Sequence, residues 1–184
     1  MLKAGMARAD ITPPLGFTLE GYPHYPRYNE GAHDPLYATC MYLADGEEVA
    51  MVTLDLLFFS KKYIEAVRRT VAKECKIPEG NIMISCTHTH SGPFTSGAID
   101  LDSLEAGRVP DEKYVAFLIR AISDIIKDAK ENSFAAKFAI GTQVCGAESG
   151  IGGNRRTPGG PHDPLVSVMA VKDMNDNVRG MFVN

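Results

Sequence analysis

Residues 81–93 read NIMISCTHTHSGP, and this stretch decides which fold the sequence predicts. Its first half, through Cys86, is short, apolar and rich in β-branched residues, which is typical of a buried strand. The polar segment 87–90 and the turn residues 91–93 follow at once. Two histidines at positions i and i+2 of extended backbone project to the same side, at the strand end where open α/β sheets place their sites. We therefore expect His88 and His90 to lie at a divalent-metal site, because neutral imidazole nitrogens are good ligands for zinc and similar metal ions.

The segments around this strand predict a βαβ unit. Residues 37–43 and 49–57 favour a hairpin around Asp45-Gly46, and residues 3–11 favour an earlier strand. A helix is expected over 60–75, with Ser60 as its N-cap and an apolar face that includes Val67 and Val71. Strand, helix and strand in this order predict two parallel strands with a right-handed crossover.

Downstream of the histidines, the pattern predicts a second helix over 111–130 and a strand over 134–145. A glycine-rich loop follows over 146–160, without the Gly-Lys-Ser/Thr of a phosphate-binding loop. The predicted fold class is α/β: a mixed β-sheet with helices 60–75 and 111–130 on one outer face. Residues 12–35 form a long loop rich in Gly, Pro and Tyr, which would either line an acyl pocket or pack over the sheet.

A short repeat relates the two ends of the chain. His33-Asp34-Pro35-Leu36 recurs as His162-Asp163-Pro164-Leu165, and at the same offset residues 37–55 align with residues 166–184. We therefore expect the repeat 33–55/162–184 to form two related hairpins, each started by an Asp-Pro pair. His33 and His162 then have structural roles.

Composition excludes several classes of protein. A chain of 184 residues is one domain or part of a larger one, and its net charge of −4 argues against nucleic acid as the main partner. No apolar run approaches the ~20 residues that span a bilayer, and the N-terminus lacks the apolar centre of a signal peptide. The four cysteines show no Cys-x-x-Cys spacing, which favours reduced thiols in a cytoplasmic protein. Cys86, two residues before His88, is either a thiolate ligand or a small buried apolar residue.

The whole string is more specific than its two histidines. THTHSGP at 87–93 resembles the neutral ceramidase family (neutral/alkaline, non-lysosomal) of zinc-dependent hydrolases of N-acyl amide bonds. The resemblance continues in ADITPP (9–14), GY (21–22), DPLYA (34–38), VAMVTLD (49–55) and GNR (153–155), so it runs from about residue 5 to the C-terminus. It implies that the chain is the N-terminal part of a layered α/β/β/α catalytic domain.

The resemblance also implies roles for particular residues. His88 matches the family's first zinc ligand, and His90 matches a histidine close to the attacked carbonyl. Asn154 and Arg155 match a segment that contacts substrate, which would be a small-molecule or lipid amide. Independently of the resemblance, the place of Asp55 at a strand end beside the βα turn suits either a hydrogen bond to a ligating histidine or, more simply, a structural turn or cap.

The family's later residues, namely a second histidine ligand, a glutamate, a tyrosine and a catalytic serine, have no counterpart here. We therefore expect one incomplete zinc site, unless a second chain or a loop histidine such as His24 adds ligands. We also expect a homo-oligomer, because an uncovered apolar sheet face and an unpaired edge strand favour self-association. Two alternatives stay open: a non-catalytic truncated or metal-binding domain, and a metal hydrolase of another family that shares only His-x-His, as in metallo-β-lactamase-like enzymes and amidohydrolases.

Overall fold

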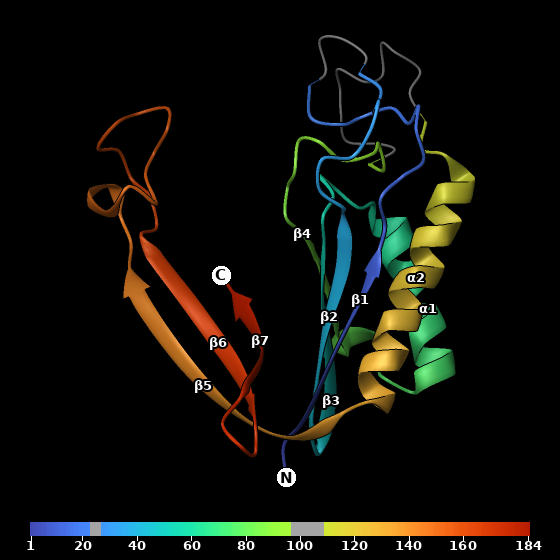
Figure 1. Ribbon diagram of the computed structural model, residues 1–184, viewed down its shortest axis with the longest axis vertical. Helices are drawn as coiled ribbons and strands as arrows, with labels where there is room; N and C mark the ends of the chain where they lie inside the picture. Colours follow the sequence, from blue (N-terminus) through green and yellow to red (C-terminus); the bar gives the residue numbers. More distant parts are fainter. Residues whose placement is uncertain (23–26, 97–108) are drawn as a thin grey trace. The chain divides into compact units, whose positions relative to one another are not determined.

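The computed structural model describes residues 1–22, 27–96 and 109–184. It contains two compact units, which Figure 1 shows and which we describe separately. The N-terminal unit is Ala4–Ser133. The C-terminal unit joins Met1–Lys3 to Phe134–Asn184.

The described residues of the N-terminal unit form a mixed sheet that packs with helices α1 and α2. Its strands are β1 (Lys3–Asp10), β2 (Tyr37–Asp45), β3 (Glu47–Leu54) and β4 (Ile82–Cys86), which neighbour one another in the order β4-β3-β2-β1. Strands β2 and β3 are antiparallel around Gly46, whose φ of 85° suits the tight turn. Helix α1 (Lys61–Cys75) and the short 3-10 helix η1 (Glu79–Asn81) then lead into β4, which runs parallel to β3. The predicted hairpin and βαβ unit are therefore confirmed.

Both helices of the N-terminal unit pack on one face of its sheet, as predicted. Helix α2 (Glu112–Glu131) begins at Asp111, whose carboxylate accepts a hydrogen bond from the backbone of Tyr114. Helix α1 has Ser60 at its N-cap position, but that side chain makes no capping hydrogen bond. A single core joins the sheet to both helices; its fully buried members include Val52, Leu54, Val67, Val71, Leu118, Ile122 and Ile126.

The C-terminal unit is an antiparallel sheet. Strands β5 (Phe134–Val144), β6 (Leu165–Asp173) and β7 (Val178–Val183) pair in that order, and the loop between β5 and β6 contains the short 3-10 helix η3 (Ala147–Ser149). The backbone of Leu2 is tied to this unit by a hydrogen bond from the amide of Ala136, 3.0 Å long. Large apolar side chains are exposed on these strands, among them Phe138, Ile140, Val144 and Met181.

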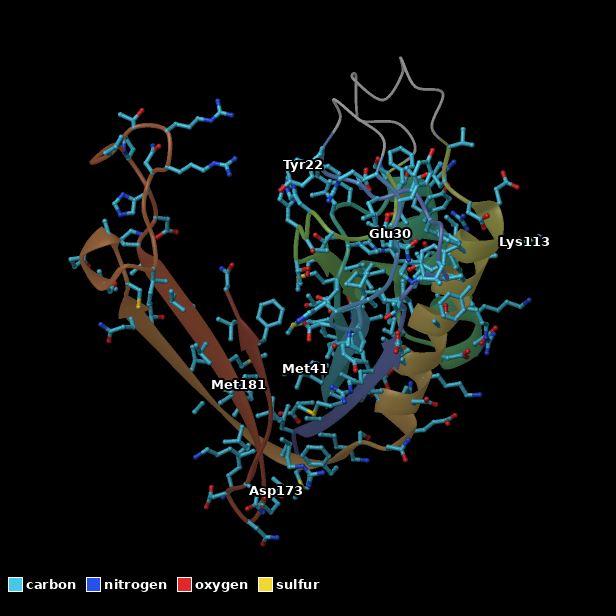
Figure 2. The ribbon with its side chains drawn as sticks, turned by 45° about the horizontal axis from the view of Figure 1, so that its top comes forward. Tyr22, Glu30, Met41, Lys113, Asp173 and Met181 are labelled. Atoms are coloured by element: carbon cyan, nitrogen blue, oxygen red, sulfur yellow. The ribbon has the colours of Figure 1, made fainter. Side chains whose placement is uncertain are left out.

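The two copies of the sequence repeat both fold as antiparallel hairpins, β2–β3 and β6–β7. Their turns differ. In the second copy, Oδ1 of Asp173 accepts hydrogen bonds from the backbone of Asn175 and Asn177, and the pairing shifts register at Val171/Lys172. Figure 2 labels Asp173 at this turn and Met181 on β7. The shared Asp-Pro start therefore leads into hairpins of the same kind but of different turn geometry.

Among the described residues, no helix is long and apolar enough to cross a bilayer.

Candidate functional site

The site lies where β4 ends. Hydrogen bonds from the amides of Thr87 to Leu54 O (2.9 Å) and of His88 to Leu56 O (3.0 Å) carry the β3–β4 pairing just past the strand. The backbone then turns, because His88 has a φ of 63°. The expectation of extended backbone through both histidines is therefore wrong at His88. A left-handed conformation is uncommon for a residue other than glycine and costs of order 1–3 kcal/mol, and such outliers gather at functional sites.

The turn nevertheless brings the two imidazoles together. Their ring centroids lie 5.0 Å apart and the ring planes are 78° from each other. Both side chains are exposed. Phe58 contacts the His88 ring edge-on at 5.2 Å, and Tyr22 contacts the His90 ring in the same way at 5.5 Å.

Hydrogen bonds to the backbone determine which ring nitrogens carry protons. Nδ1 of His88 lies 3.3 Å from the carbonyl oxygen of Leu57, and Nδ1 of His90 lies 3.0 Å from that of Gly21. A carbonyl oxygen only accepts hydrogen bonds, so both Nδ1 atoms must donate. In the neutral rings, both Nε2 atoms then hold a lone pair, which is the form of histidine that binds metals or accepts a proton.

Gly21 makes the close approach of His90 possible. Its φ is 107°, and a Cβ atom at this position would stand 2.8 Å from Cγ and Nδ1 of the His90 ring. Only glycine accepts both the dihedral angle and the contact. The sequence showed a Gly-Tyr pair here but gave no sign that it would lie against a histidine 69 residues away.

The segment before Gly21 is fastened to the segment after His90. Leu19 forms an isolated antiparallel bridge with Pro93, the amide of Phe94 donates to Thr18 O at 2.9 Å, and the amide of Glu20 donates to Gly92 O at 2.9 Å. The buried carboxylate of Glu20 also accepts from the amide of Thr95 at 3.2 Å. Part of the long loop predicted over 12–35 is therefore ordered by pairing with the histidine segment.

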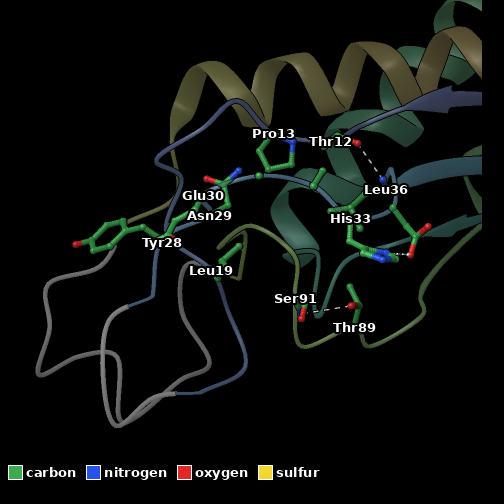
Figure 3. Close-up of a pocket in the computed structure, with 13 residues that line it drawn as sticks. Thr12, Pro13, Leu19, Tyr28, Asn29, Glu30, His33, Leu36, Thr89 and Ser91 are labelled. Carbon is green, nitrogen blue, oxygen red and sulfur yellow. Dashed lines mark hydrogen bonds and ion pairs between the residues drawn. The ribbon is translucent and has the colours of Figure 1, made fainter.

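Two pockets adjoin this segment. A mainly apolar one of about 330 Å³ is bounded by His88 and by Leu57, Phe58, Phe59, Ser60, Ile64, Ile84, Cys86 and Ser96. A more polar one of about 700 Å³ is bounded by Thr89 and Ser91, with Tyr28, Glu30 and His33 among its other residues (Figure 3). Figure 2 places Tyr22 and Glu30 at the same end of the N-terminal unit. Within the segment 88–91, His88 therefore adjoins the apolar pocket, whereas Thr89 and Ser91 adjoin the more polar one.

The other residues that the sequence suggested as metal ligands or as partners of a ligand, Cys86 and Asp55, make other contacts in the structure. Cys86 is half-buried against the core. Its partial burial, with a smaller contribution from Glu20, raises the pKa of its thiol to about 11, so it stays protonated at neutral pH, which favours the apolar alternative over a thiolate ligand. The Asp55 carboxylate accepts from the amide of Tyr37 at 2.9 Å, which is the turn-holding alternative. Across residues 1–22, 27–96 and 109–184, no group of three or more His, Cys, Asp or Glu side chains is placed to hold a metal. His24 lies outside those residues.

The remaining histidines make local contacts. Nδ1 of His33 lies 2.8 Å from the carboxylate of the adjacent Asp34, on an almost fully exposed side chain. Nδ1 of His162 lies 3.1 Å from the carbonyl oxygen of Gly160. These contacts agree with the structural roles expected for both.

Asn154 and Arg155 belong to the C-terminal unit, in the loop between β5 and β6. Oδ1 of Asn154 accepts from the amides of Arg156 (3.0 Å) and Thr157 (2.9 Å), and its Nδ2 donates to Pro161 O at 3.1 Å. Asn154 therefore holds the loop in shape. Arg155 is exposed beside it.

Comparison with solved structures shows the fold. A crystal structure of neutral ceramidase from Pseudomonas aeruginosa superposes with a TM-score of 0.82 at 23% identity, over 99% of this chain and 31% of that one. A structure described as ceramidase complexed with C2 superposes with a TM-score of 0.73, also at 23% identity, over 99% and 30%. The predicted α/β fold class is therefore confirmed.

Sequence comparisons lead to the same group of proteins. Neutral ceramidase of Drosophila melanogaster is 34% identical over 97 residues, covering 50% of this chain and 14% of that protein. The Pseudomonas aeruginosa enzyme is 24% identical over 200 residues, covering 96% and 28%. The chain thus spans less than a third of the length of these relatives. Because the family profile described as "Neutral/alkaline non-lysosomal ceramidase, N-terminal" matches residues 2–149, the chain belongs to the neutral/alkaline non-lysosomal ceramidase family.

Proposed function

We propose that this chain supplies part of the active site of a zinc-dependent hydrolase that cleaves the N-acyl amide bond of a ceramide-like lipid. His88 would bind the zinc through Nε2, and His90 would lie next to the attacked carbonyl. The observation that carries the proposal is that both Nδ1 atoms donate to backbone carbonyls, which leaves both Nε2 lone pairs available. Ligating histidines are commonly oriented in this way.

The tautomer of His90 limits what it can do. When neutral, its Nε2 has no proton and can accept one from the attacking water; when protonated, it can donate a hydrogen bond to the developing oxyanion. Hydrolysis joins the water oxygen to the carbonyl carbon and breaks the carbon–nitrogen bond. The proton that His90 takes from water is the one that the leaving amine needs. Zinc, when bound, polarises the carbonyl or lowers the pKa of a water to roughly 7.

The substrate assignment rests on family membership and on the surroundings of His88. The pocket of about 330 Å³ beside it is mainly apolar and suits part of a hydrocarbon chain. We further propose that the exposed Arg155 contacts polar groups of the substrate, with Asn154 fixing the loop that carries it.

The zinc site would be completed by residues other than those described. Catalytic zinc sites usually have three protein ligands and a water, and the described residues offer two imidazoles. We expect the 184-residue chain to retain less than one zinc per chain and to hydrolyse N-acyl amides little or not at all. A non-catalytic metal-binding domain would behave identically in the zinc measurement, so activity has to be measured in a longer protein that contains this chain.

The test is elemental analysis after exhaustive dialysis against zinc-free buffer. His88→Ala should remove the zinc that remains, whereas His33→Ala, an exposed histidine with only a neighbouring aspartate as partner, should not. The proposal fails if zinc retention is unchanged by His88→Ala. One tightly held zinc per chain, together with turnover, would show that the ligand set described here is wrong.

A further inference from the structure

Arg27 makes an unusual set of contacts beside the histidine pair. Its Nη2 donates to two backbone carbonyls, that of His90 at 2.7 Å and that of Glu20 at 3.2 Å. Its guanidinium lies over the ring of Tyr22, with Cζ 4.3 Å from the ring centroid. The side chain is half-buried and reaches across 63 residues of sequence to His90.

These contacts engage the guanidinium of Arg27 with groups of the protein itself. Its Nε is fully buried and has no hydrogen-bond partner among the described residues. The face of the guanidinium is taken up by Tyr22, and Nη2 is directed at the two carbonyls. An arginine arranged in this way holds protein groups in place rather than offering its charge to a substrate.

Arg27, Tyr22, Gly21 and His90 form a closed set of contacts around the His90 ring. Arg27 binds the His90 backbone, Tyr22 contacts both the Arg27 guanidinium and the His90 ring, and the carbonyl oxygen of Gly21 accepts from His90 Nδ1. We propose that Arg27 is a positioning residue for His90: by tying its backbone to the 20–22 segment, it keeps Nδ1 on Gly21 O and so keeps the lone pair on Nε2.

Arginine suits this role better than lysine. The guanidinium is planar, so it stacks on Tyr22 while a single edge nitrogen serves two carbonyls; an ammonium is a compact point charge that stacks less well. Arg27→Lys should therefore keep the charge and lose the positioning. Arg27→Met also removes the charge and the hydrogen bonds, so it should abolish the positioning of His90 more completely than Arg27→Lys.

The test measures the tautomer of each histidine, which a merely structural role would not change. Protein labelled with ¹⁵N-histidine is studied by long-range ¹H–¹⁵N correlation at a fixed mildly alkaline pH, without metal. In the unaltered chain, both His88 and His90 should carry the proton on Nδ1. Arg27→Lys should shift the His90 ratio about fivefold toward Nε2–H, which corresponds to the loss of about 1 kcal/mol of hydrogen bonding. His88, held by Leu57, should not change.

The control is Arg69→Lys, because Arg69 is exposed and its one ion pair within the described part of the chain is with Glu65 at 4.0 Å. Should Arg27→Met fold poorly, Tyr22→Leu removes the ring that stacks on the guanidinium and contacts the His90 ring, and it should change the His90 tautomer in the same direction. An unchanged His90 tautomer in folded Arg27→Lys protein would overturn the inference, as would equal changes at His88 and His90. The inference deepens the proposed role of His90, but the measurement needs neither zinc nor substrate, so its failure is distinct from failure of the hydrolase proposal.

Discussion

Gly21→Ala should expel the His90 ring from its place. The added Cβ would stand 2.8 Å from two ring atoms, and the backbone φ of 107° is one that alanine rarely adopts. The dihedral strain is worth of order 1–3 kcal/mol, and losing the bond from His90 Nδ1 to Gly21 O adds about 1 kcal/mol. We therefore expect the free energy of unfolding to fall by about 2–4 kcal/mol.

Gly16→Ala is the matched control, because Gly16 also has a positive φ, 82°, but a Cβ there would meet no atom within 4 Å. It should cost about 1–2 kcal/mol from the dihedral angle alone. Both variants can be compared by urea unfolding followed by circular dichroism, since the chain contains no tryptophan.

A double-mutant cycle then isolates the contact with the ring. In a His90→Ala background, the cost of Gly21→Ala should fall by about 1 kcal/mol, because the hydrogen bond from His90 Nδ1 is already lost and the ring atoms Cγ and Nδ1 are gone, although the Cβ of residue 90, 2.9 Å from the added methyl, remains. If Gly21→Ala costs no more than Gly16→Ala, or if its cost is the same with and without His90, the ring does not lie against Gly21 and the site geometry described above is wrong.

Three further predictions follow from the core and the surface. Burial raises the pKa of Cys40 from 9.0 to about 12, so the unfolded chain releases this proton first. The contribution of Cys40 to stability should be full below pH 9 and fall by about 1.4 kcal/mol per pH unit between 9 and 12, so the stability of Cys40→Ala should decline less steeply with pH over this range. The buried Tyr114 hydroxyl donates to Ile11 O, so Tyr114→Phe should lower the unfolding free energy by about 1–2 kcal/mol, whereas Tyr28→Phe on an exposed ring should have little effect in the same unfolding assay. The exposed Phe138, Ile140 and Val144 on β5 should drive self-association, so light scattering should detect a dimer or larger species at micromolar concentration that Ile140→Lys weakens; a clean monomer would contradict this.

Local sequence patterns were sufficient to predict the helices, the strands and the pairing of neighbouring strands. Alternation of apolar residues, Asp45-Gly46 and the apolar face of residues 60–75 are local patterns, and local patterns predict the hairpin, the helix and the parallel pair β3–β4. The sequence also placed His88 and His90 at a strand end, since two histidines so close in the chain must lie close in space. The glycine-rich pattern likewise predicted that Asn154 and Arg155 lie in a loop, and the structure confirms this. The pattern could not predict where that loop lies relative to the histidines.

The way the two histidines are held depends on contacts between distant segments, which local patterns do not report. The left-handed φ of His88 could not be foreseen, because a residue other than glycine adopts it only when surrounding contacts impose it. The partners of His90 are Gly21, Tyr22 and Arg27, which lie more than 60 residues earlier in the chain and carry no local signal of that contact. Sequence patterns report what each segment prefers for itself. Which carbonyl fixes a ring nitrogen depends on how distant segments pack, and that packing sets the tautomer on which the proposed chemistry depends.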